Sequence, residues 1–156
     1  MSNQQPSNKS EEFKLERYKY ILEELRSLNE NVHKYLTLFQ SLATLIIGGG
    51  VGVFVSWQSL KITAAMAKVS IQGLVGMLII LAVFAMISII AGMISWFDYR
   101  KEEVALLDDA IERGYRRTPK WGNFWRWSET YVLLFIVIMT IIISWFVENQ
   151  VIPLIK

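Results

Sequence analysis

The sequence predicts an all-α integral membrane protein with three transmembrane helices and a cytoplasmic helical stalk. Three observations carry this prediction. Three long segments contain no Asp, Glu, Lys, Arg or His, an apolar repeat precedes the first segment, and Lys and Arg are concentrated on one side of the predicted membrane. A helix crosses a bilayer with about 20 apolar residues, and roughly 17 is the lower limit. All three segments are long enough, so we expect a multi-pass protein in the lipid bilayer of the cytoplasmic (inner) membrane.

The chain begins with a polar segment, residues 1–10, that we expect to be disordered. An amphipathic helix should follow over residues 11–34. Its apolar side chains alternate in steps of three and four residues, a pattern that builds coiled-coil seams. The members of this seam are Tyr18, Ile21, Leu25, Leu28 and Val32. The seam must be buried, either on the chain's own loop or on lipid headgroups, or in self-association with other subunits.

The first transmembrane helix is expected over residues 35–60, continuous with the amphipathic helix. Small or polar residues recur along it every four positions, and two more glycines lie beside them. This small-residue row consists of Gln40, Thr44, Gly48, Gly52 and Ser56, with Gly49 and Gly50 alongside. In lipid, such a row lets two helix backbones approach closely. It predicts helix packing or a pore lining, either within one chain or between subunits.

A short outer loop, residues 61–68, should lead into the second transmembrane helix, residues 69–97. This helix has its own stripe of small residues, which consists of Ala85, Ser88, Gly92 and Ser95. Residues 98–129 should form a cytoplasmic helix that continues the span, followed by a juxtamembrane loop. We expect this extension to reach Arg113 and to pair, antiparallel, with the extension of the first span.

The end of this extension carries four basic residues, Arg113, Arg116, Arg117 and Lys120. They act as topology determinants on a solvated face, or they contact anionic lipid headgroups or a partner protein. The third transmembrane helix is expected over residues 130–147, and an outer C-terminal tail over residues 148–156.

The distribution of charge predicts the orientation. The N-terminal segment and the 98–129 loop carry 13 of the 16 Lys and Arg residues, and the other side carries 3. By the positive-inside rule, the N-terminus lies in the cytoplasm and the C-terminus lies outside. Tryptophans prefer the headgroup layer, and they fall at the predicted ends of the spans. These tryptophans are Trp57, Trp96, Trp121, Trp125, Trp127 and Trp145.

Several function classes have no support in the sequence. The chain has no cysteine and one histidine, so we expect no thiol chemistry, no metal site and no cofactor. The net charge is only +2, which leaves no electrostatic footprint for nucleic acid. The spans lack the ionisable residues that transporters and proton pumps use. We therefore do not expect an enzyme, a transporter or a nucleic-acid partner.

The sequence favours a small homo-oligomer that forms a pore or otherwise perturbs the membrane barrier. Its cytoplasmic helices would set assembly or receive a signal. The alternative is a non-conducting membrane anchor or scaffold that docks a soluble cytoplasmic partner on the stalk and the 98–129 loop.

Overall fold

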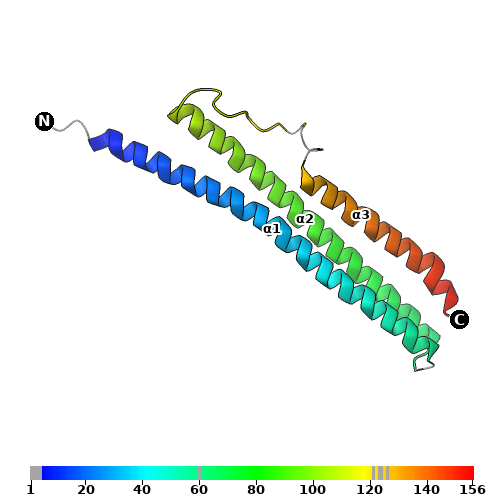
Figure 1. Ribbon diagram of the computed structural model, residues 1–156. Coiled ribbons are helices and arrows are strands. Elements are labelled where there is room, and N and C mark those ends of the chain that lie inside the picture. Colours follow the sequence, from blue (N-terminus) through cyan, green and yellow to red (C-terminus); the bar gives the residue numbers. More distant parts are fainter. Residues whose placement is uncertain (1–4, 60, 121, 123–124, 126) are drawn as a thin grey trace. The chain divides into compact units, whose positions relative to one another are not determined.

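The computed structural model describes residues 5–59, 61–120, 122, 125 and 127–156. Within this part of the chain the fold is all-helical and has no strand (Figure 1). The three long helices are α1 (Gln5–Gln58), α2 (Ala64–Ala110) and α3 (Ser128–Phe146). By length and composition, each is able to cross a membrane. The prediction of three long apolar helices is therefore confirmed. Residues 1–4, Leu60, Trp121 and Arg126 lie outside the described residues.

The chain forms two compact units, and α1 and α2 each contribute a part to both. Unit 1 consists of Met1–His33 and Ile90–Trp127, and unit 2 consists of Lys34–Ile89 and Ser128–Lys156. In α1 the boundary falls at the last charged residue before the first uncharged segment. In α2 it falls inside the uncharged segment, so residues 90–97 pack with unit 1.

In unit 1 the N-terminal part of α1 pairs with the C-terminal part of α2. Three contacts establish an antiparallel pairing, because the residue number falls on α2 as it rises on α1. Lys14 lies 2.5 Å from Asp109, Arg17 lies 2.6 Å from Glu102, and the Tyr20 and Tyr99 rings are 6.4 Å apart. The predicted pairing of the two helix extensions is thus seen in the structure.

The first of these ion pairs is exposed and depends on pH. The hydrogen bond from Lys14, and then its charge, lower the pKa of the Asp109 carboxyl below the usual range. Because this pKa is lower in the folded chain, the pair stabilises unit 1 above the ordinary pKa of an aspartate. The stabilisation is lost as the pH falls through the lowered pKa. Because the pair is exposed, solvent screens it and its contribution to stability is small.

α2 begins at Ala64, earlier than the expected start at residue 69. The hydroxyl of Thr63 accepts a hydrogen bond from the backbone N–H of Met66 at 3.3 Å, which is the bond of an N-cap. At its other end, α2 stops at Ala110, short of the expected Arg113. Gly114 follows in the left-handed region with φ +84°, and its N–H donates to the Asp108 carboxylate at 2.9 Å. Glycine adopts this conformation without a Cβ clash.

Both termini of the chain differ from the expected segments. α1 starts at Gln5, inside the segment that was predicted to be disordered. After α3, helical turns continue through a π-helix, Val147–Val151, and a 3₁₀-helix, Ile152–Leu154. Ile155 is then fully buried against Ala67 and Ile71 of α2. The predicted outer tail therefore docks on unit 2, because its apolar residues complete a small core there.

Candidate functional site on the open face of α1

The small-residue row of α1 divides into two faces in unit 2. Cβ atoms built on Gly49 and Gly50 would lie 3.7 and 3.9 Å from the Leu74 side chain of α2. These two glycines therefore face α2 within the chain. Cβ atoms built on Gly48 and Gly52 would meet nothing within 4 Å. The sequence spacing places Gly48 and Gly52 in the row and Gly49 and Gly50 beside it, and the structure adds that only the second pair meets α2.

Gly48 and Gly52 lie on a face of α1 that the chain leaves open. Gln40 and Thr44 continue this face and are exposed, whereas Ser56 is half-buried at its edge. Larger apolar side chains flank the glycines, and Leu45 and Val55 are 70% and 52% exposed. We call Gln40, Thr44, Gly48 and Gly52 the open face. It has the form of a shallow strip of small residues between apolar ridges, which suits the approach of another helix.

The polar groups on the open face differ in how they are satisfied. The Thr44 hydroxyl donates to the backbone oxygen of Gln40 at 2.8 Å, so its own helix satisfies it. Among the described residues, no hydrogen bond joins the side-chain amide of Gln40 to another group. An exposed amide in a membrane span is costly unless it finds a polar partner or water.

The small-residue stripe of α2 has a different role. Ala85 is buried, and Ser88, Gly92 and Ser95 are half-buried. A Cβ built on Gly92 would lie 3.8 Å from the Val32 side chain, so in unit 1 this glycine faces α1. Gly92 is therefore matched inside the chain, whereas nothing in the described part of the chain packs on Gly48 and Gly52 of the open face.

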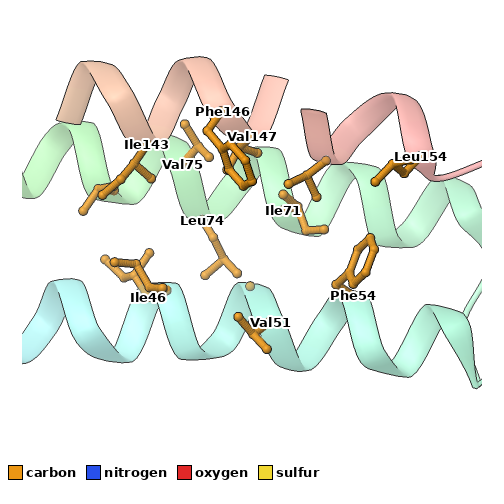
Figure 2. Close-up of a pocket in the computed structure, with 14 residues that line it drawn as sticks. Ile46, Val51, Phe54, Ile71, Leu74, Val75, Ile143, Phe146, Val147 and Leu154 are labelled. Carbon is orange, nitrogen blue, oxygen red and sulfur yellow. The ribbon is translucent and has the colours of Figure 1, made fainter. Parts of the chain in front are cut away.

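Unit 2 also contains an apolar cavity of about 410 Å³. All three helices contribute to its wall, as Figure 2 shows, and its lining side chains are apolar. Phe54 of α1, Ile71 and Leu74 of α2 and Ile143 and Phe146 of α3 lie around it. No titratable group lines the cavity, so its chemistry is limited to holding a hydrocarbon.

The seam of α1 is largely buried in unit 1. Ile21 is fully buried and Leu25 is 7% exposed, and Tyr18, Leu28 and Val32 are half-buried. On α2 the matching stripe of Phe97, Val104 and Leu107 is buried as well, whereas Ile111 lies beyond the helix and is 59% exposed. In the described residues the seam is therefore buried within the chain itself, and self-association through its half-buried members stays a prediction.

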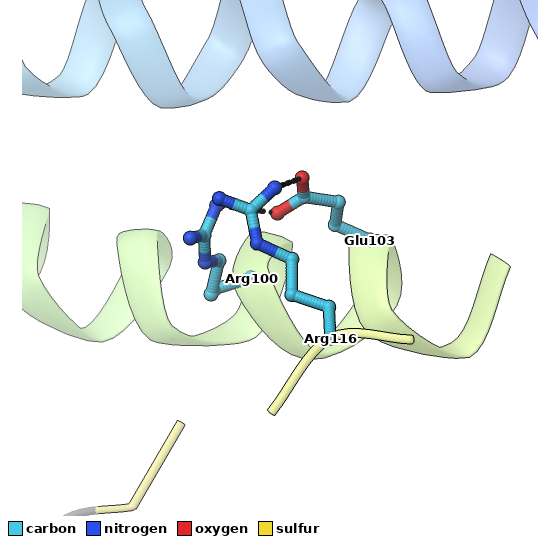
Figure 3. A network of polar contacts seen from close by, with 3 residues as sticks. All are labelled: Arg100, Glu103 and Arg116. Atoms are coloured by element: carbon cyan, nitrogen blue, oxygen red, sulfur yellow. Dashed lines mark hydrogen bonds and ion pairs between the residues drawn. The ribbon is translucent and has the colours of Figure 1, made fainter. Parts of the chain in front are cut away.

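A buried ion cluster in unit 1 was not predicted. Glu103 of α2 is fully buried. Its carboxylate forms ion pairs with Arg100, one turn earlier in α2, and with Arg116, in the loop after α2 (Figure 3). The Arg100 Nη1 lies 2.6 Å from the Glu103 Oε2. From the sequence, Arg116 is expected on a solvated face or in contact with lipid headgroups or a partner protein. Its pairing with a buried carboxylate instead ties the loop back to α2. Arg113, Arg117 and Lys120 are exposed, as the sequence predicts.

The acidic residues of the 98–129 loop do not form a cation site. Glu102, Glu103 and Asp109 are each engaged by a basic residue. Within the described residues, no group of three His, Cys, Asp or Glu side chains is arranged to hold a metal ion.

The tryptophans divide between exposed and packed positions. Trp125 and Trp145 are 67% and 59% exposed. Trp96 packs edge-on against Trp127 with ring centroids 5.3 Å apart, and the ring centroid of Trp57 lies 5.6 Å from that of Phe54.

Comparison with protein-family models, with curated proteins and with solved structures found no match for this chain.

Proposed function

We propose that the chain assembles in a membrane as a homo-oligomer through the open face of α1, and that the assembly forms a pore or otherwise perturbs the barrier. The observation that carries this proposal is the free space at Gly48 and Gly52. A helix in lipid gains no hydrophobic free energy from pairing, so close backbone packing and interhelical hydrogen bonds drive association. The open face offers both, since its glycines admit a second backbone and Gln40 offers an amide.

The polar groups of the same face supply a wet lining. In a ring of α1 helices turned toward a common axis, Gln40 and Thr44 would surround the conducting path. The glycines would allow the helices to pack closely beside it. Uncharged polar linings of this kind pass ions without an ionisable residue in the span.

The proposed orientation places unit 1 in the cytoplasm and Lys61 outside, which the 13-to-3 distribution of Lys and Arg supports. A cysteine introduced at Ser128 should be shielded from an impermeant thiol reagent in intact cells, and one introduced at Ser59 should be labelled. Labelling of Ser128→Cys from outside would reverse the orientation.

Ion flux from liposomes tests the function. Vesicles that contain the purified chain should lose a trapped ion gradient. Vesicles with the Gly48→Leu/Gly52→Leu variant should lose it at least about tenfold more slowly, because overpacking an interface costs roughly 1–3 kcal/mol per site. Equal insertion of both proteins is the control. If the vesicles kept their ion gradient although the protein in them was oligomeric, the proposal of a pore would be excluded.

One observation favours the anchor as a second candidate. Near its N-terminus, α1 exposes Phe13 and Leu15, which are 66% and 54% accessible. Unit 1 also exposes the cations Arg113 and Arg117 after α2, and exposed apolar and basic side chains together would suit a soluble acidic partner. In this case the oligomer would hold a partner at the membrane without conducting.

A further inference from the structure

The apolar cavity of unit 2 requires an apolar occupant. A space of about 410 Å³ is within the range of small-molecule sites. If it stayed empty, its walls would lose the dispersion contacts that close packing provides. Water is a poor filler, because a buried water needs two to four polar partners and the lining is apolar. In a bilayer the available filler is a lipid acyl chain.

One end of the cavity is closed by a small core. Ala67, Ile71 and Ile155 are buried there, and Phe54 and Val151 belong both to the residues packed on this core and to the cavity wall. An acyl chain in the cavity would therefore extend away from this core, or turn out of the cavity beside it.

Three lysines lie close in sequence to the residues of this small core. Lys68 lies one helical turn before Ile71 on α2, Lys61 lies in the connection between α1 and α2, and Lys156 follows the buried Ile155. In the part of the chain that the structure describes, none of these lysines is in an ion pair with a carboxylate. Glu148 is the one acidic residue in the sequence after Glu129, so this part of the chain carries an excess of positive charge.

We propose that unit 2 binds one anionic phospholipid, with an acyl chain in the apolar cavity and its phosphate held by Lys61 and Lys68. The charge and the cavity complement the two parts of such a lipid. The lysines attract the phosphate over about one Debye length, and the apolar walls accept the acyl chain. This site rests on the membrane insertion of the proposed function, and it is independent of the oligomer.

Native mass spectrometry of the full chain in mild detergent tests the site. The probes are phosphatidylglycerol and phosphatidylcholine with the same acyl chains. We expect one phosphatidylglycerol to be retained per chain, more tightly than phosphatidylcholine. Lys61→Gln and Lys68→Gln should each weaken phosphatidylglycerol binding about fivefold and leave phosphatidylcholine unchanged. Lys34→Gln makes the same charge change at the other end of the first uncharged segment and should have no effect.

A second pair of variants tests the cavity. Val75→Phe would take up part of the cavity and should weaken the binding of both lipids, whereas Val83→Phe on an exposed part of α2 should not. If the Val75→Phe protein fails to insert into the membrane, the two lysine variants still test the lipid site. Equal retention of the two lipids, or binding that neither lysine alters, would overturn the proposal. The proposal would also be overturned if each chain lost its lipid when a second copy of the chain bound to it. That result would mean that a helix of the second copy occupies the cavity.

The two proposals fail in different ways. Loss of the oligomer in Gly48→Leu/Gly52→Leu with unchanged retention of phosphatidylglycerol would support a lipid site that does not depend on assembly. If phosphatidylglycerol and phosphatidylcholine were retained equally while the oligomer stayed intact, the lipid site would be rejected and the proposed function would stand.

Discussion

The Gly48→Leu/Gly52→Leu variant should insert into membranes normally and migrate as a monomer where the original chain is an oligomer. Two leucines on the open face would hold a neighbouring backbone away from α1, and the loss of close packing should weaken association at least about tenfold. Insertion should persist because leucine is more apolar than glycine. The measurement is the mass of the protein in nanodiscs, by light scattering or mass photometry.

The chain provides a matched control for this variant. Gly73 of α2 also has nothing within 4 Å of a built Cβ, yet it lies outside the open face. Gly73→Leu should leave the mass unchanged. An unchanged mass for the double variant would mean that Gly48 and Gly52 face lipid, and the same loss in Gly73→Leu would mean that assembly does not depend on the open face.

Removal of both arginines from the buried ion cluster should destabilise unit 1 strongly. In Arg100→Ala/Arg116→Ala, the Glu103 carboxylate would remain buried without a counter-charge, and breaking a buried pair in this way costs about 3–5 kcal/mol. Denaturant unfolding can be followed by the fluorescence of unit 1, in which Trp96 and Trp127 are in contact. The expected result is a clearly lower midpoint.

Two further variants test whether the unpaired charge of Glu103 causes this loss of stability. Adding Glu103→Leu to the double variant should restore most of the stability, since an apolar side chain replaces the unpaired carboxylate. Lys14→Ala breaks only the exposed pair with Asp109 and should leave the unfolding midpoint almost unchanged. If Lys14→Ala and the double variant were equally destabilised, burial of Glu103 would have no energetic consequence.

The helices could be predicted from sequence because their signals are local. Long uncharged runs and a heptad seam depend only on residue order, and Thr63, Gly114 and the seam occupy the positions that local rules favour. The early start of α2 at Ala64 is harder to predict, because a charged residue such as Lys68 is more typical of a loop than of a membrane span. Lys68 is in fact half-buried within the helix.

The site depended on information that the sequence does not contain locally. The four-residue spacing separates Gly48 and Gly52 from Gly49 and Gly50, but it does not show which pair is covered, and only the position of Leu74 on α2 does. Glu103 was missed because it appeared as one of several loop carboxylates. One signal was available, since it lies next to Val104 and one turn before Leu107, on the buried stripe of α2.

Cysteine cross-linking in native membranes tests the central claim, that the open face of α1 joins copies of the chain. The chain has no cysteine, so a single cysteine at Gly52 reports only its own neighbours. Disulfide formation requires Cα atoms within about 7 Å. Mild oxidation should convert Gly52→Cys to a covalent dimer and leave Val83→Cys, on the exposed surface of α2, as a monomer. No dimer at Gly52→Cys, or equal dimers at both positions, would contradict the claim.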